Sequence, residues 1–451
     1  MVCPANVARI HGGSRLCFGR LIANALSRVM LCLGLLLLGG GCKTFSSRVV
    51  SDPSAAVARL QAGGDVEEEV NRLAQPLVES GEIYGIAVGV LTPDRRTRFF
   101  GYGRTGLAGD EQLPNGDTIF QVGSLSKVFL AALLAKLVEE GALHYEDTVR
   151  SILPPEVPLA EEIGKVTLYE LILNKGGLPR QPFTLSQLRD FTAFLFTGRN
   201  LYAYFDKPYM YNYLRKKRIK PREERDYVYS NIGFGLLSHL IEVKTGRPYP
   251  ELLEEKICRP LHLRDTTFFL TADQKKRLAV GHAGVQPRFL RRGHPMDPWD
   301  MGEILRLPGC LYSTVNDLMV FAKANLGILG NPLEPLLAET QRVQLSRATE
   351  DVAFAWLVNY LGDDRQAVTY KQGVMSGYAS YIGLNVKACV GVVVLYNTFS
   401  WEEGVGHNLV LRLSQGLVPP PIPPVTRPTV PRPVNIGRKR PVGCRSSLWR
   451  S

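Results

Sequence analysis

The sequence has few cysteines and none of the short spacings that hold a metal. Its 451 residues include 8 cysteines and 7 histidines, with no C-x-x-C and no H-E-x-x-H. Cys258, Cys310 and Cys389 are scattered among apolar neighbours, which favours buried hydrophobic residues over a disulfide set. There is also no G-x-S-x-G, which argues against an α/β-hydrolase. We therefore expect no metal site and no cofactor.

The apolar run near the N-terminus is too short to cross a bilayer. Leu31–Leu38 follows a stretch with four arginines, a pattern typical of the core of a signal peptide. The Cys42 that comes after three glycines resembles a bacterial lipoprotein cleavage site. We expect residues 1–42 to be a signal peptide of the lipoprotein type, with Cys42 lipidated and anchored to a membrane. An ordinary signal peptide with a chance cysteine is the alternative, and in both cases the protein is exported, to the periplasm or as an anchored lipoprotein.

Acidic residues are missing from the C-terminal tail. Residues 418–451 are rich in proline and arginine and contribute much of the net charge of +12. This composition predicts an extended, disordered tail, either solvated or in contact with an anionic polymer or membrane surface. A second basic run, Arg215–Lys220, lies near several tyrosines. In an exported protein we expect this run to line a cleft rather than to bind nucleic acid.

A serine and a lysine at i,i+3 spacing precede a strongly apolar helix. Ser124 and Lys127 would lie side by side, and the run Val128–Val138 predicts a buried helix that ends near Gly141. A serine becomes a nucleophile when a base is adjacent, and a lysine serves if burial and nearby cations lower its pKa. The N–H groups at a helix N-terminus also favour developing negative charge. Taken alone, the pair is better explained as an N-cap serine and a solvated lysine, and the catalytic interpretation depends on the order, spacing and context of all three motifs.

Two further motifs add a phenol, a carboxamide and a cation. Tyr229 and Asn231 are two residues apart on a segment predicted to be extended, so that their side chains point the same way. Lys371 and Gly373 form a K-x-G motif beside predicted strands, where the glycine lets a substrate approach the backbone. Rival K-x-G matches elsewhere fall in a loop or at a predicted helix end.

The strand pattern predicts an antiparallel sheet. The expected strands are a hairpin over 84–100 and three segments over 366–370, 378–384 and 388–396. The middle of the chain is predicted to be mainly helical and to carry Ser124 and Tyr229. The expected fold class is therefore α/β, an antiparallel sheet flanked by helices plus a mainly helical lobe, with the site between them. We place Lys371 at a sheet edge that faces the end of the core helix.

In order and spacing the three motifs resemble the serine β-lactamase and penicillin-binding protein superfamily. The most similar part is the class C β-lactamase-related branch, which includes D,D-peptidases and esterases. The likeness runs from about Val70 to Leu417 and extends to Gly177–Pro179, Arg259–Phe268 and Gly309–Thr314. One departure is Asn174–Gly176, which stands where relatives often carry His-Thr-Ser.

The resemblance implies roles for seven residues. Ser124 would attack the carbonyl and form an acyl-enzyme, while Lys127 and Tyr229 share the proton transfer. Asn231 would hold the substrate amide and orient Lys127. Lys371 would pair with a substrate carboxylate. The N–H groups of Ser124 and of Val374, the residue after Gly373, would form an oxyanion hole, in which each donor is worth about 3–4 kcal/mol.

The resemblance implies a serine hydrolase and leaves three functions open. The first is a D,D-carboxypeptidase or endopeptidase on cell-wall peptides that also binds or hydrolyses β-lactams, and the cation at Lys371 favours it. The second is an esterase on the same scaffold. The third is a non-catalytic penicillin-binding lipoprotein. The chain is divided into the signal peptide, a linker over 43–69, a β-lactamase-related catalytic domain over 70–417 and the tail over 418–451.

Overall fold

The computed structural model describes residues 65–106, 112–182, 185–202, 204–361, 365–401 and 404–415. The expected signal peptide, Cys42 and the C-terminal tail lie outside these residues. Helix α3 (Val66–Glu79) begins inside the segment 43–69 that we assign to a linker. The last four residues of that segment are therefore helical. In the described part of the chain, no helix combines the length and the hydrophobicity that a membrane crossing requires.

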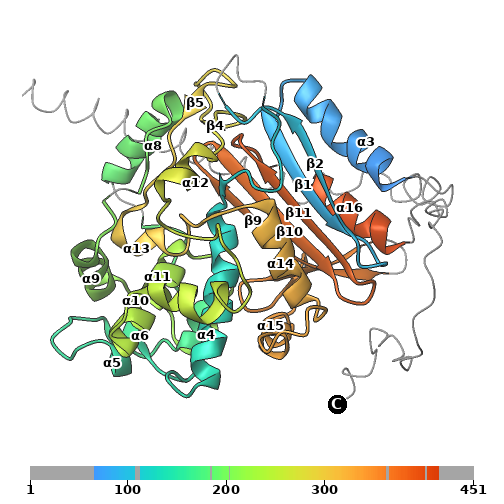
Figure 1. The fold of residues 1–451 in the computed structure, drawn as a ribbon. Helices are drawn as coiled ribbons and strands as arrows, with labels where there is room; N and C mark the ends of the chain where they lie inside the picture. The colour runs from blue at the N-terminus through green and yellow to red at the C-terminus, as the bar shows by residue number, and fades with distance from the viewer. Residues whose placement is uncertain are drawn as a thin grey trace, which may run out of the picture. The chain divides into compact units, whose positions relative to one another are not determined.

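A seven-stranded sheet in which all neighbours are antiparallel forms one half of the fold (Figure 1). The strand order is β2-β1-β11-β10-β9-β8-β7. The strands are β1 (Gly85–Leu91), β2 (Thr97–Gly103), β7 (Asp351–Val352), β8 (Leu357–Leu361), β9 (Gln366–Met375), β10 (Tyr378–Asn385) and β11 (Val390–Tyr396). Among the described residues, the first and last strands of this sheet in chain order, β1 and β11, therefore pair with each other, as expected for a sheet built from an N-terminal hairpin and C-terminal strands.

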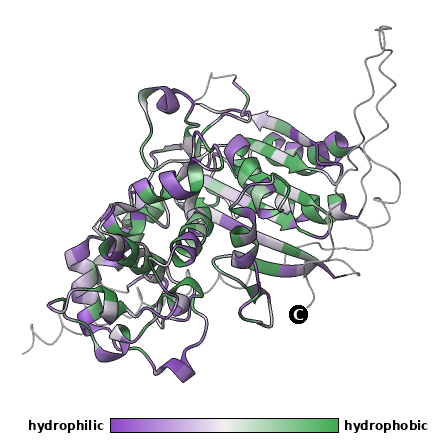
Figure 2. Ribbon diagram, turned by 60° about the horizontal axis from the view of Figure 1, so that its bottom comes forward, coloured by the Kyte–Doolittle hydropathy of each residue, from purple (hydrophilic) through white to green (hydrophobic). Residues whose placement is uncertain are grey.

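Helices cover both faces of this sheet. Helix α3 and helix α16 (Gly404–Ser414) pack on the face that presents Ile86, Val88 and Val90. Helix α14 (Val315–Asn325) packs on the other face, where a Cβ atom on Gly89 would lie only 2.6 Å from Val315. Strands β1, β10 and β11 are buried along their whole length because both faces are covered. Figure 2 shows this as strands in which hydrophobic residues predominate.

The middle of the chain forms the mainly helical lobe, which confirms the predicted fold class. Its helices are α4 (Ser126–Glu139), α5 (Val149–Ile152), α6 (Glu161–Gly164), α7 (Leu168–Ile172), α8 (Leu185–Thr197), α9 (Lys207–Lys216), α10 (Asn231–Thr245), α11 (Tyr249–Leu253), α12 (Ala272–Lys276) and α13 (Gly302–Arg306), followed later by α15 (Glu334–Thr340). The shorter pieces are β3 (Phe120–Gln121) with β6 (Tyr312–Ser313), β4 (Gly281–His282) with β5 (Pro295–Met296), and the helical turns η1 (Gly123–Leu125), η2 (Arg222–Glu224) and η3 (Glu254–Cys258).

Helices α4 and α10 form the core of this lobe. Both are apolar on nearly every side, and most of their residues are buried. Helix α4 ends at Glu139, shortly before Gly141 with its φ of 73°. Helix α10 ends at Thr245, where the sequence predicts a helix end, and Gly246 caps it in a left-handed conformation. Helix α4 begins within the motif of Ser124 and Lys127, and helix α10 begins within the motif of Tyr229 and Asn231. Because both helices are buried, they hold these reactive side chains in defined positions.

The position of Lys371 differs from the expectation of an edge strand. Strand β9 lies inside the sheet, between β10 and β8. Strand β8 is short, however, and its pairing with β9 stops at Leu357 opposite Tyr370. From Lys371 to Met375, β9 therefore has no partner strand on that side and instead packs against η1. The prediction was wrong about the strand, although the local edge it required is present where β8 ends.

Candidate active site

The serine and lysine of the first motif meet at the start of helix α4. Ser124 lies in the 3₁₀ turn η1, which leads into α4, and Lys127 is in the first turn of that helix. Lys127 Nζ donates a hydrogen bond to Ser124 Oγ at 2.9 Å and another to the carbonyl oxygen of Pro308 at 3.2 Å. Ser124 is partly exposed, whereas Lys127 is only 1% exposed. A partly exposed serine is therefore hydrogen-bonded to a lysine that is shielded from solvent.

Burial alters the protonation of Lys127. Removal of the ammonium from water lowers its pKa to about 7, with a further contribution from the nearby guanidinium of Arg180. An amine with this pKa is partly neutral at physiological pH and can accept a proton from the adjacent hydroxyl. A lysine whose pKa is lowered by burial and by a nearby cation is what a base for Ser124 needs.

Tyr229 lies among three cations. The distances to the centroid of its ring are 5.3 Å from Lys127 Nζ, 5.0 Å from Lys371 Nζ and 5.5 Å from Arg180 Cζ. Lys371 is 4% exposed, and burial is the main cause that lowers its pKa. The cluster brings together a phenol, a hydroxyl and positive charge, and it favours anionic groups of a substrate.

Asn174 holds the segment that carries Tyr229. Its side-chain Oδ1 accepts a hydrogen bond from the backbone N–H of Ser230 at 2.8 Å, and its carbonyl oxygen accepts one from Val228 at 3.0 Å. Asn174 is buried and adopts a φ of 57°, a left-handed conformation that asparagine tolerates better than most residues. Although this loop departs from His-Thr-Ser, it is bonded to the residues directly before and after Tyr229 in the chain.

A buried ion pair fastens the stretch before Tyr229. The side chain of Arg225, 1% exposed, pairs with Glu170 at 3.1 Å and Glu162 at 3.2 Å, and it also donates to the carbonyl oxygen of Lys220 at 2.8 Å. Loss of one partner of a buried pair is strongly destabilising because the other charge stays buried. The basic run Arg215–Lys220 just before it is largely exposed.

The third motif brings its backbone against the first. A Cβ atom on Gly373 would lie 2.1 Å from the carbonyl oxygen of Val122 and 2.7 Å from the backbone nitrogen of Ser124. A Cβ atom on Gly123 would lie 2.8 Å from the backbone nitrogen of Val374. Only glycine fits at these two positions. The backbone nitrogens of Ser124 and Val374 therefore belong to two segments in direct contact.

Asn231 begins helix α10, directly after the cap residue Ser230. Its backbone N–H donates to the carbonyl oxygen of Arg180 at 3.0 Å. The hydrogen bonds of Lys127 to described residues go to Ser124 and Pro308, and the role of Asn231 in orienting this lysine stays a prediction. Among the described residues, the carboxamide of Asn231 has no hydrogen-bond partner, so a substrate amide could bind there.

Sequence reasoning missed two charged residues near the site, Arg180 beside Tyr229 and Glu350 near Lys371. Arg180 follows directly after Gly177–Pro179, a segment that the resemblance includes, and this adjacency is a signal that was available. Glu350 gave no signal in the sequence. Its carboxylate accepts a hydrogen bond from the hydroxyl of Tyr370 at 2.7 Å and pairs with Arg347 at 3.3 Å. Glu350 thus lies next to the strand residue that precedes Lys371.

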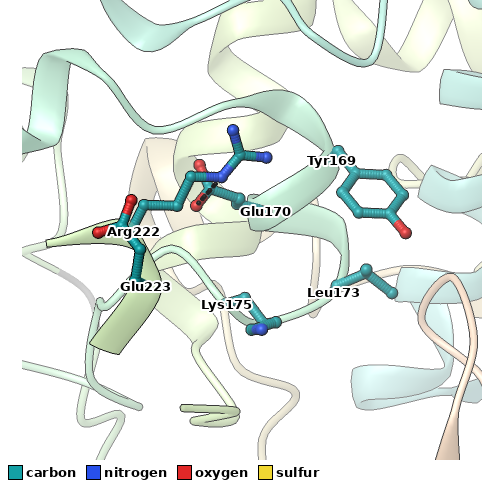
Figure 3. Close-up of a pocket in the computed structure, with 6 residues that line it drawn as sticks. All are labelled: Tyr169, Glu170, Leu173, Lys175, Arg222 and Glu223. Carbon is teal, nitrogen blue, oxygen red and sulfur yellow. Dashed lines mark ion pairs between the residues drawn. The ribbon is translucent and has the colours of Figure 1, made fainter. Parts of the chain in front are cut away.

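Two surface pockets lie apart from this cluster. One, of about 400 Å³, is lined by Tyr169, Glu170, Leu173, Lys175, Arg222 and Glu223 (Figure 3). The other, of about 500 Å³, is lined by residues 197–200 and 294–299. Ser124, Tyr229 and Lys371 line neither of them. We therefore assign the candidate site from the convergence of reactive groups and not from the volume of a cavity.

A sequence model described as Beta-lactamase matches residues 70–416. The chain belongs to the beta-lactamase family. This family member is 23% identical over 336 residues to the D-alanyl-D-alanine-carboxypeptidase/endopeptidase AmpH of Escherichia coli strain K12, an alignment that covers 72% of this chain and 82% of that protein. It is also 26% identical over 219 residues to a beta-lactamase of Pseudomonas fluorescens, covering 48% of this chain and 55% of that one.

Solved structures of the same family have the same fold. A class C beta lactamase from Rhodobacter sphaeroides superposes with a TM-score of 0.65 and is 23% identical in sequence. The alignment covers 77% of this chain and 98% of the beta lactamase chain. The D-alanine carboxypeptidase AmpC from Burkholderia cenocepacia has a TM-score of 0.61 and 20% identity, with the same coverage of 77% and 98%. At such identities the likeness concerns the fold. Membership of the beta-lactamase family makes this protein a serine hydrolase.

Proposed function

We propose that this serine hydrolase is a D,D-carboxypeptidase or endopeptidase that acts on cell-wall peptides and is acylated by β-lactams. The observation that carries the proposal is Lys371, a buried cation 5.0 Å from the ring of Tyr229. No carboxylate among the described residues lies within 4.0 Å of its ammonium group. Glu350 attracts this charge from beyond ion-pair distance, and a buried charge without a directly bonded carboxylate is costly unless a ligand supplies one. A substrate that ends in a carboxylate provides the missing partner.

In the proposed reaction, Ser124 Oγ attacks the carbonyl carbon of the substrate. Its proton passes to Lys127, which lies 2.9 Å away and whose pKa is lowered to about 7 by burial. Tyr229 shares this proton transfer. The N–H groups of Ser124 and Val374 bind the oxygen that becomes negatively charged. The C–N bond then breaks as Lys127 and Tyr229 pass this proton to the departing amine, and an acyl group remains on Ser124.

The second half of the reaction uses the same groups. A water molecule gives a proton to the base and attacks the acyl carbon. The ester C–O bond then breaks, the base returns the proton to Ser124 Oγ, and the carboxylic acid is released. The proposal is tested by incubation with a peptide that ends in D-Ala-D-Ala and with a neutral ester. We expect release of D-alanine at the higher kcat/KM. A preference for the ester would support the esterase alternative, and turnover of neither would support a non-catalytic penicillin-binding protein.

Replacement of Lys371 with alanine is expected to affect the two substrates unequally. A hydrogen bond to a charged group is worth about 1.5–3 kcal/mol, so kcat/KM on the peptide should fall about 10- to 150-fold more than on the ester. The matched control is Lys244→Ala, because Lys244 lies exposed in the last turn of α10 and belongs to a rival K-x-G match. Equal losses on both substrates would contradict a carboxylate-binding role for Lys371.

We also propose that the protein is exported and that Cys42 carries the lipid that anchors it. Support comes from the sequence pattern alone, since Cys42 lies outside the described residues. The Cys42→Ser variant is expected to move from the membrane fraction to the soluble fraction of cells, as measured by fractionation and immunoblotting. An unchanged distribution would contradict the anchor at Cys42.

A further inference from the structure

Arg180 has a backbone that is fastened to the Tyr229–Asn231 motif. The residue before it, Pro179, accepts a hydrogen bond from Ser230 Oγ at 2.8 Å, and Arg180 itself accepts one from the N–H of Asn231 at 3.0 Å. The next residue, Gln181, accepts a bond from the hydroxyl of Tyr202 at 2.6 Å. These three contacts hold Arg180 at a defined position beside the reactive cluster.

The guanidinium of Arg180 is held near the site without a carboxylate. Its Cζ lies 5.5 Å from the centroid of the Tyr229 ring, and the side chain is exposed. Throughout the described residues, its side chain forms neither an ion pair nor a hydrogen bond. A guanidinium presents two parallel N–H groups that match the two oxygens of a carboxylate. It is therefore available to a ligand that enters the site.

Arg180 and Lys371 differ in depth although both adjoin Tyr229. Lys371 is buried, whereas Arg180 is exposed. A substrate that places its terminal carboxylate at Lys371 extends toward solvent on its acyl side. Because the backbone of Arg180 is bonded to Asn231, the proposed holder of the substrate amide, this acyl side passes close to Arg180.

We propose that Arg180 binds a second carboxylate, carried by the acyl side of the substrate. The enzyme would then prefer peptides that have an acidic group on the residue that precedes the D-Ala-D-Ala end. This inference rests on the proposed function, because it assumes that Lys371 receives the terminal carboxylate. The competing role for Arg180 is indirect: its charge would act on the protonation of Lys127 and so affect all substrates alike.

Two β-lactams separate these roles. Benzylpenicillin and carbenicillin share the same nucleus and ring carboxylate, and carbenicillin has one additional carboxylate on its acyl side chain. The second-order rate constant of acylation is measured with both compounds for the unmutated enzyme, Arg180→Gln and Arg180→Lys. We expect Arg180→Gln to lower the carbenicillin-to-benzylpenicillin ratio by about 5-fold, since an exposed charge pair is screened by water. The ratio for the unmutated enzyme should also fall as salt is added.

The controls make the outcomes distinct. Arg180→Lys should restore part of the ratio because it keeps the charge but loses the paired N–H groups. Arg189→Gln should leave the ratio unchanged, since Arg189 is an exposed residue of α8 that pairs with Asp190. If Arg180→Gln lowers the acylation rate constant equally for both β-lactams, the inference about Arg180 is overturned and the proposed function is not. Failure of both compounds to acylate the unmutated enzyme would overturn the proposed function and the inference with it.

Discussion

Replacement of Ser124 with alanine is expected to lower kcat/KM by at least about 10⁴-fold, the scale seen when a catalytic nucleophile is removed. Ser124 carries the hydroxyl that is bonded to Lys127, and it lies against the backbone of Gly373. Without this hydroxyl no acyl-enzyme forms. The measurement is turnover of a D-Ala-D-Ala peptide, together with thermal unfolding to show that the variant is folded.

The matched control is Ser126→Ala. Ser126 belongs to the same motif, but its hydroxyl is buried and donates to the carbonyl oxygen of Gly123. We expect this variant to lose about 1 kcal/mol of stability and to retain acylation. Retained turnover in Ser124→Ala, or loss of acylation in folded Ser126→Ala only, would contradict the choice of nucleophile.

The activity is expected to depend on pH through Lys127. The neutral amine is the form that accepts a proton, and burial lowers its pKa to about 7. Below that pH the amine is protonated and cannot act as a base, so kcat/KM should rise as the pH increases through about 7 and then level off. A rise centred near the ordinary value for lysine, about 10.4, would contradict the buried state of this amine.

Lys127→Ala should lower kcat/KM by about 10²- to 10⁴-fold, the usual contribution of a general base, and should abolish the rise near pH 7. Lys136→Ala is the matched control because Lys136 lies on the same helix, near its C-terminal end, and pairs with Glu139 on the surface. This control should keep both the activity and the pH profile. A profile that survives the loss of Lys127 would assign the titration to another group.

The parts of the fold that depend on local sequence could be predicted. Helices α4 and α10 follow from apolar runs that end in glycine, and the i,i+3 spacing of Ser124 and Lys127 becomes a hydrogen bond because a helical turn brings them together. The strands of the sheet also follow from apolar, β-branched segments. Such features need information from a few neighbouring residues only.

Features that depend on the length of a distant partner could not be predicted. The local edge at Lys371 exists because β8 stops opposite Tyr370, and no residue near Lys371 encodes that stop. The support that Asn174 gives to Ser230 joins residues far apart in the chain, as does the ion pair of Arg225 with Glu170. The exposure of Arg180 beside Tyr229 likewise depends on how the loop folds back on α10.

The most direct test of the account is to locate the acyl group by mass spectrometry. The purified protein is incubated with benzylpenicillin, digested and sequenced, with Ser124→Ala treated in parallel. The account predicts one adduct with the mass of the intact β-lactam, located on Ser124 and absent from the variant. An adduct on another residue, or an adduct that persists in Ser124→Ala, would contradict the assignment of Ser124 as the nucleophile.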